Sequence, residues 1–234
     1  MNKVIVKERP ILFSGAMVRA LLAGTKNQTR RKLKHEHFAK HLGSSPLDVA
    51  AYVAQHDMKP FCPYGKPGDR LWVREAWFPM RYDWKELGSA APILYSDGEI
   101  ANRAKWGEAY NGTRPPMGWA WKSPIHMPRA ASRILLEITD VRCERLQDIS
   151  EDDAVVEGVE VVDTLNGQPL HYYDYVSNTP AWSSLRLGPA VQMTAKGSYE
   201  TLWESINGPG SWAANPWVWV VGFKVLDGKE ATRA

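Results

Sequence analysis

The segment Trp217–Val225 constrains the fold of this chain more than any other stretch. It reads Trp-Val-Trp-Val-Val-Gly-Phe-Lys-Val, and β-branched and aromatic residues of this kind are enriched in strands. Residues 11–13, 70–77 and 134–139 also show the short apolar or alternating patterns that are typical of strands. These segments predict that a sheet forms the centre of the fold.

Short helices are predicted between these strands. Ser14 is a suitable N-cap for a helix with an apolar face, and Gly24 fits the position just after the end of that helix. Another helix is predicted over residues 199–206, and the glycines and proline of residues 207–210 end it. The fold class that follows is α+β, mostly β with helices around the sheet.

Three long stretches separate the structured regions, and they are rich in Gly, Pro, Asn, Asp and Ser. They cover about residues 35–61, 81–121 and 160–196. Loops of this length in a compact domain are usually functional lids or flexible connections. A chain of 234 residues fits one large domain. We therefore expect a single domain over 1–234 with three insertions.

Composition points to a protein of the cytoplasm with a weak basic bias. The formal net charge is +3, which is compatible with a nucleic-acid partner without requiring one. The two cysteines are far apart, so we expect reduced thiols. No apolar run is long enough to cross a membrane, and the first ten residues lack the apolar core of a signal peptide. Most of the eleven tryptophans are expected in the core, and some could stack on a base.

Lys26 and Thr29 are the first candidates for chemistry. A neutral lysine amine can take the proton of a threonine hydroxyl, which then becomes a nucleophile, and the neighbouring Arg30 and Arg31 would favour the neutral amine. On a flat strand, side chains three residues apart point to opposite faces, so the two converge only if the segment is a turn or a helix. The alternative is a solvated basic loop.

Glu157 is the candidate proton donor. Ser150 and Asp153 resemble a capping box that opens a short helix over 151–157, which Gly158 ends. Glu157 then lies at the negative end of the helix dipole, a position that disfavours its ionised form and suits a general acid. The alternative is an exposed glutamate with no such role.

Two segments carry a resemblance to a known family. Residues 22–31 resemble the "L-x-G-x-K-T-x-T-x-R" segment of the ASCH family, a branch of the PUA-like fold. Residues 146–158 are similar to its "l-x-d-i-[ST]-e-x-x-A-x-x-E-G" helix, and Pro67-Gly68-Asp69 matches its turn before a strand. Residues 217–225 look like its closing strand. The resemblance covers about half of the chain and implies a mostly β PUA-like barrel with surrounding helices, of the larger type found in phages and prophages.

The resemblance also implies an activity. One small bacterial ASCH enzyme is an amidohydrolase that removes the acetyl group from N4-acetylcytidine with a lysine, a threonine and a glutamate. Those positions fall on Lys26, Thr29 and Glu157, whereas Asn27 replaces the first threonine of the segment. The implied mechanism has Lys26 as base, Thr29 as nucleophile and an initially protonated Glu157 as acid. Other ASCH and PUA-like proteins bind RNA, and some resemble ribonucleases, so a binding module without turnover or a ribonuclease remains an alternative.

Several further residues are candidates for binding the modified nucleoside or RNA. Each has a structural alternative: a basic loop, the solvent-facing side of a strand, a cap on a strand edge or part of the core. They are Arg31, Arg74, Glu75, His126, Arg129, Asn215 and Trp217.

We expect no metal and no cofactor. His35, Glu36 and His37 are adjacent in a polar loop, but no second cluster has the spacing of metal ligands. No P-loop and no dinucleotide-binding fingerprint is present. The sequence leaves the oligomeric state open.

Overall fold

The structure is a computed structural model, and it describes part of the chain. The described residues are 6–34, 52–53, 56–79, 93–95, 100–101, 120–165, 168–176 and 191–226. Much of the expected insertions 35–61 and 81–121, and part of 160–196, lies outside these ranges.

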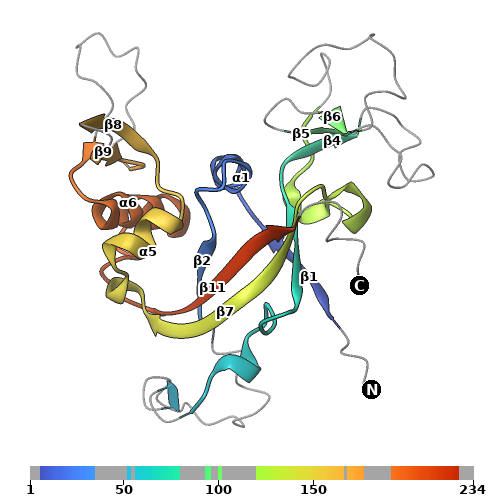
Figure 1. Cartoon of the computed structure of the whole chain (residues 1–234), viewed down its shortest axis with the longest axis horizontal. Helices are drawn as coiled ribbons and strands as arrows, with labels where there is room; N and C mark the ends of the chain where they lie inside the picture. Colours follow the sequence, from blue (N-terminus) through green and yellow to red (C-terminus); the bar gives the residue numbers. More distant parts are fainter. Residues whose placement is uncertain are drawn as a thin grey trace. The chain divides into compact units, whose positions relative to one another are not determined.

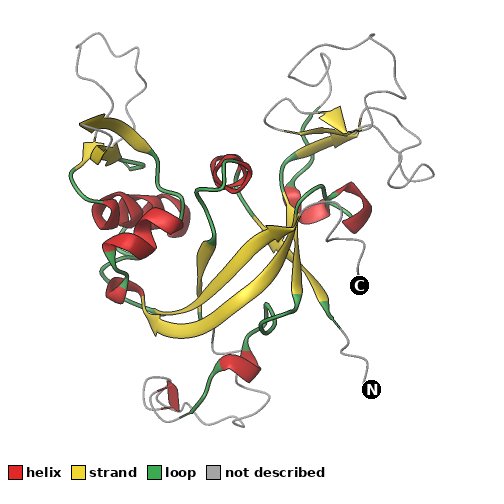
Figure 2. Ribbon diagram, viewed as in Figure 1, coloured by secondary structure: helices red, strands yellow, loops and turns green. Residues whose placement is uncertain are grey.

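The largest sheet has five strands in the order β1-β3-β7-β11-β2. Strands β1 and β3 are parallel, whereas β3 with β7 and β11 with β2 are antiparallel (Figure 2). The two edge strands, β1 and β2, do not pair with each other, so the sheet is open and the expected barrel is not closed in the described part of the chain. The fold is mixed α+β with a mostly β core. The strand bounds are β1 Glu8–Leu12, β2 Gln28–Lys32, β3 Arg70–Arg74, β7 Leu135–Arg145 and β11 Trp217–Leu226.

The chain divides into two compact units. The first takes in Met1–Gly24, Pro67–Thr139 and Phe223–Ala234, and the second takes in Thr25–Lys66 and Asp140–Gly222. Strands β7 and β11 each contribute residues to both units.

The first unit contains helix α1 (Gly15–Leu22) and a small sheet. The Ser14 hydroxyl accepts a hydrogen bond from the backbone N–H of Met17, and Gly24 follows the helix with a φ of +73°, as the sequence predicts. The small sheet has the order β4-β5-β6. Its strands, and the two 3₁₀ turns beside it, are β4 Trp77–Pro79, β5 Ile93–Tyr95, β6 Ile100–Ala101, η5 Pro124–His126 and η6 Arg129–Ala131.

The predicted single strand 70–77 is wrong, because it is divided between two sheets. Strand β3 ends at Arg74, and β4 begins at Trp77 in the small sheet. Between them the Glu75 N–H donates to Met127 Sδ, and the buried Glu75 carboxylate binds Arg133 through two hydrogen bonds. These tertiary contacts interrupt the strand, and the local alternation of the sequence contains no sign of them.

The second unit contains helices α5 (Glu151–Val156) and α6 (Ala195–Asn207), which lie side by side (Figure 1). Their apolar residues share a core with Val218 and Val220 of β11. An antiparallel sheet in the order β10-β9-β8 occupies part of the expected insertion 160–196, which is therefore not wholly irregular. Its bounds, and those of two 3₁₀ turns, are β8 Val161–Leu165, β9 Gln168–Tyr173, β10 Val191–Gln192, η1 Lys59–Phe61 and η7 Leu146–Asp148.

In the part of the chain that the structure describes, no helix has the length and apolarity needed to cross a membrane.

Candidate functional site

Helix α5 and the segment before β2 hold the candidate catalytic residues together. The Ser150 hydroxyl accepts a hydrogen bond from the Asp153 N–H at 3.0 Å and caps the start of the helix. Glu157 is the C-cap, and Gly158 follows with a φ of +84°. The Asn27 N–H donates to the Val156 carbonyl at 3.0 Å, which fixes the segment that carries Lys26 against the end of α5.

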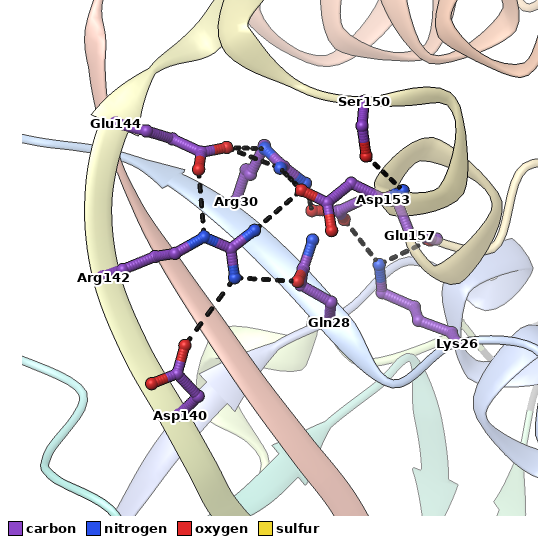
Figure 3. A network of polar contacts seen from close by, with 9 residues as sticks. All are labelled: Lys26, Gln28, Arg30, Asp140, Arg142, Glu144, Ser150, Asp153 and Glu157. Carbon is purple, nitrogen blue, oxygen red and sulfur yellow. Dashed lines mark hydrogen bonds and ion pairs between the residues drawn. The ribbon is translucent and has the colours of Figure 1, made fainter.

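Lys26 and Glu157 form a buried pair. Lys26 Nζ lies 2.9 Å from Glu157 Oε2 and 2.6 Å from the Glu157 carbonyl oxygen (Figure 3). The side chains are 0% and 2% exposed. Two oxygens of Glu157 thus accept hydrogen bonds from the buried lysine nitrogen.

Arg30 binds the other oxygen of the same carboxylate. Its Nη1 donates to Glu157 Oε1 at 3.0 Å, and its side chain has no exposed surface. Its Nη2 reaches Asp153 Oδ2 at 2.7 Å, while Nε and Nη2 both reach Glu144 Oε1. One guanidinium thus joins three carboxylates that come from β7, α5 and the end of α5 (Figure 3).

Arg142 closes this network into a ring. Its guanidinium donates to Glu144 Oε2 at 3.0 Å, to Asp153 Oδ2 at 2.7 Å and to Gln28 Oε1 at 3.2 Å. Arg142 is 36% exposed and Asp153 is 26% exposed, so the ring reaches solvent, whereas Lys26 and Glu157 do not. Charges of opposite sign alternate around the ring, and each carboxylate has a cationic partner.

Burial lowers the pKa of Lys26 below 10.5, because the ammonium ion loses its hydration. The Glu157 charge and hydrogen bond oppose this shift, and the Arg31 and Arg30 charges add to it. Both Glu157 oxygens accept hydrogen bonds from cationic side chains, which is the bonding pattern of a carboxylate. These hydrogen bonds differ from those expected of the initially protonated acid that the family resemblance implies for Glu157.

The charges of Arg30 and Glu157 also shift the pKa values of two neighbouring residues, Asp153 and Tyr199. Burial would raise the pKa of Asp153, but hydrogen bonding and charge from Arg30, with the Arg142 charge, lower it below 3.8. Burial and the Glu157 charge raise the pKa of Tyr199 well above 10.0, so its phenol stays protonated. The Tyr199 ring also lies 5.9 Å from the Arg30 guanidinium, within the range of a cation–π contact.

Thr29 is not part of this cluster. It is buried in β2, where it is opposite Val221 of β11. Because side chains alternate along a strand, Thr29 faces away from the side on which Gln28 and Arg30 enter the network. Among the described residues, no hydrogen bond joins its hydroxyl to Lys26 or Glu157. The structure thus brings together two of the three predicted catalytic residues.

Asn215 and Trp217 belong to the same unit but contact other residues. The side-chain oxygen of Asn215 accepts a hydrogen bond from the Gln147 N–H at 2.9 Å. The backbone carbonyl of Asn215 accepts a hydrogen bond from the Arg145 guanidinium at 3.0 Å. The Arg145 guanidinium lies 4.9 Å from the centre of the Trp217 ring. Asn215 has a φ of +40°, so this turn depends on a residue that tolerates the left-handed region. Arg31, the remaining candidate in this unit, is half-buried in β2.

The other four binding candidates lie in the first unit, where each has its own surroundings. Arg74 donates to the Ile125 carbonyl and lies over the Trp72 ring. Glu75 binds Arg133, and the exposed Arg129 pairs with Glu8. His126 is the last residue of η5.

The described residues hold no group of three or more His, Cys, Asp or Glu side chains that could bind a metal ion. His35, Glu36 and His37 lie outside the described residues. Both cysteines are thiols, and burial, Cys62 and Glu144 raise the pKa of Cys143 to about 12.

Five members of the site were not predicted from the sequence: Arg30 as a ligand of Glu157, together with Gln28, Arg142, Glu144 and Asp153. A signal for two of them was present. Asp153 and Glu157 are four residues apart and therefore share a face of α5, and Gln28 and Arg30 share a face of β2.

No protein-family model, curated protein or solved structure matches this chain. The class of protein that the fold and the site define is a mixed α+β protein with a buried lysine–glutamate pair inside a ring of ionic contacts.

Proposed function

We propose that this chain is a cytoplasmic ASCH-type protein with a PUA-like fold that hydrolyses the acetyl group from the exocyclic amine of a modified cytidine, without a metal ion. One observation carries the proposal: Lys26 and Glu157 come from two separate motifs and meet as a buried pair. A buried lysine whose pKa is lowered is a better candidate for a general base than an exposed lysine.

The proposed reaction begins with neutral Lys26. Its amine accepts the proton of the attacking hydroxyl, and the oxygen of that hydroxyl adds to the acetyl carbonyl. The C–N bond to the nucleobase then breaks, and the proton on Lys26 passes to the leaving amine. If the hydroxyl is that of Thr29, water hydrolyses the resulting ester and releases acetate.

Glu157 has a different role here from the one expected from the sequence. Both of its oxygens already accept hydrogen bonds from Lys26 and Arg30. As a carboxylate it orients the lysine amine and stabilises the ammonium ion that forms when Lys26 takes the proton. Lys26 is then both the base and the source of the proton for the leaving amine.

Two nucleophiles are compatible with Lys26 as the base, the Thr29 hydroxyl and water. Thr29 is three residues from Lys26, but its side chain points to the other face of β2. Either Thr29 attacks after a local rearrangement, or Lys26 activates a water molecule directly. In the second case acetate forms in one step and no acetyl group is attached to the protein.

The position of Thr29 also favours a second candidate, a module that binds RNA or a modified base without turnover. Arg145 and the half-buried Trp217 form a guanidinium–indole pair of the kind that contacts bases in single-stranded nucleic acid. Such binding would weaken steeply with salt, because contacts to phosphates release counterions.

One experiment separates the two candidates. The wild type and Thr29→Ala are incubated with N4-acetylcytidine, and loss of the acetyl mass is followed by mass spectrometry. Turnover by the wild type supports the amidohydrolase, and its loss in Thr29→Ala identifies the nucleophile. If neither protein releases acetate and the wild type binds an RNA oligonucleotide with steep salt dependence, the binding module replaces the enzyme.

A further inference from the structure

The guanidinium of Arg30 occupies the position from which it can fix the Glu157 carboxylate. Glu157 Oε1 receives Arg30 Nη1 at 3.0 Å, while Oε2 receives Lys26 Nζ at 2.9 Å. With one oxygen held on each side, the carboxylate cannot rotate without breaking one of the two contacts (Figure 3). We infer that Arg30 is a positioning residue that holds Glu157 against Lys26.

This inference rests on the proposed function, because positioning matters only if the Lys26–Glu157 pair reacts. It adds a residue that neither the motif spacing nor the expected triad singles out. The Arg30 side chain has no exposed surface and binds Glu157, so in the proposed reaction it acts through Glu157 rather than on the substrate.

The ring explains why an arginine stands at this position. Arg30 itself is held by Glu144 and Asp153, and those two carboxylates are held in turn by Arg142. A lysine has one nitrogen and no planar fork, so it cannot reproduce the four hydrogen bonds that Nε, Nη1 and Nη2 of Arg30 make to the three carboxylates. Nε and Nη2 of Arg30 are therefore held by Glu144 and Asp153, and Nη1 donates to Glu157.

The charge of Arg30 provides a second effect that can be measured separately. Its positive charge is one of the causes that lower the pKa of Lys26, and it also shares the Glu157 carboxylate with the lysine. Removing that charge breaks the Arg30 contact with Glu157 and leaves the Lys26 contact with the carboxylate in place. Both changes favour the ammonium form, so the pKa of Lys26 should rise.

The test uses the full chain labelled with ¹³C-lysine, and Lys26→Arg assigns the Lys26 signal in the NMR spectrum. In Arg30→Gln the Lys26 titration should move to higher pH by about one unit. In Arg30→Lys the charge remains, so the titration should stay near that of the wild type. Turnover of N4-acetylcytidine by Arg30→Lys should nevertheless fall by about 10- to 100-fold, because Glu157 is no longer held.

Arg9→Gln is the control for loss of an arginine from an ion pair, since Arg9 binds Asp69 in the first unit. It should leave the Lys26 titration unchanged. If Arg30→Gln keeps the near-UV circular dichroism of the wild type and Lys26 titrates as before, the inference is overturned. If the wild type has no turnover but Lys26 shifts as expected, the proposed reaction fails while the coupling between Arg30 and Lys26 stands.

Discussion

Lys26 and Glu157 are 131 positions apart in the sequence, and their side chains meet at 2.9 Å where solvent has almost no access. Burying a lysine in this way is costly unless a partner holds its charge or the amine becomes neutral. Glu157 supplies the partner, and burial lowers the pKa of Lys26, which favours the neutral amine. The pair is thus suited to moving a proton.

The rate of deacetylation should increase with pH. Only neutral Lys26 can accept a proton, and the neutral fraction grows as the pH rises through a pKa that lies below 10.5. We expect kcat/KM for N4-acetylcytidine to rise to a plateau with a midpoint below that value. If kcat/KM shows no rise with pH at any pH below 10.5, Lys26 is not the base.

Glu157→Gln should move that midpoint to lower pH. The Glu157 charge raises the pKa of Lys26, so its removal with the shape preserved lowers the pKa further. Glu157→Ala, in contrast, leaves two buried cations without this acceptor and should cost about 3–5 kcal/mol of stability. The pH–rate profile measures the shift in Glu157→Gln, and chemical denaturation measures the loss of stability in Glu157→Ala. An unchanged midpoint in Glu157→Gln would contradict the effect of the Glu157 charge on the pKa of Lys26.

Thr29→Ala tests whether the nucleophile belongs to the protein. If Thr29 attacks, the variant loses turnover, and a rapid acid quench of the wild type traps an acetyl group on the peptide that contains Thr29. Thr29→Ser keeps a hydroxyl and should retain part of the rate. If Thr29→Ala turns over at the rate of the wild type and no acetyl-peptide is found, water is the nucleophile.

Ser150→Ala should destabilise the protein by about 1 kcal/mol and also impair turnover. Ser150 caps the start of α5, which carries Asp153 and ends at Glu157. Loss of the cap should therefore make the positions of these two carboxylates less well defined. Ser14→Ala removes the corresponding cap of α1 in the first unit and is the matched control. It should reduce stability to a similar extent in urea denaturation while leaving kcat near that of the wild type.

Asp153→Asn should change the response of the protein to acid. The pKa of Asp153 in the folded state is lowered below 3.8, so its contribution to stability is complete above pH 3.8 and is lost as the pH falls through the lowered pKa. Denaturation midpoints measured between about pH 2 and 5 should depend less steeply on pH in the variant. Asp152→Asn, at an exposed position on the same helix, should keep the slope of the wild type.

Much of the fold follows from local sequence signals. The caps Ser14 and Ser150, the glycines after α1 and α5, and the long strand near the C-terminus all lie where the sequence predicts them. These features depend on residues that are neighbours in the chain. The division of residues 70–77 between two sheets does not, because it depends on Met127 and Arg133.

The site was predicted only in part for the same reason. The capping box of Ser150 and Asp153, with Gly158, predicts a helix that ends near Glu157, but these local signals do not show which cations reach the Glu157 carboxylate from β2. The predicted convergence of Lys26 and Thr29 requires a turn or a helix in this segment, but β2 begins at Gln28 and contains Thr29. The contacts of Arg30 with β7 and α5 join residues more than one hundred positions apart, which no local pattern reports.

The central claim is that the Lys26–Glu157 pair drives deacetylation. Its most direct test is acetate release from N4-acetylcytidine at neutral pH by the wild type and by Lys26→Met, with circular dichroism to show that both are folded. The account predicts steady release by the wild type and a loss of at least about a hundredfold in the variant. A folded Lys26→Met protein that releases acetate at the rate of the wild type would contradict it.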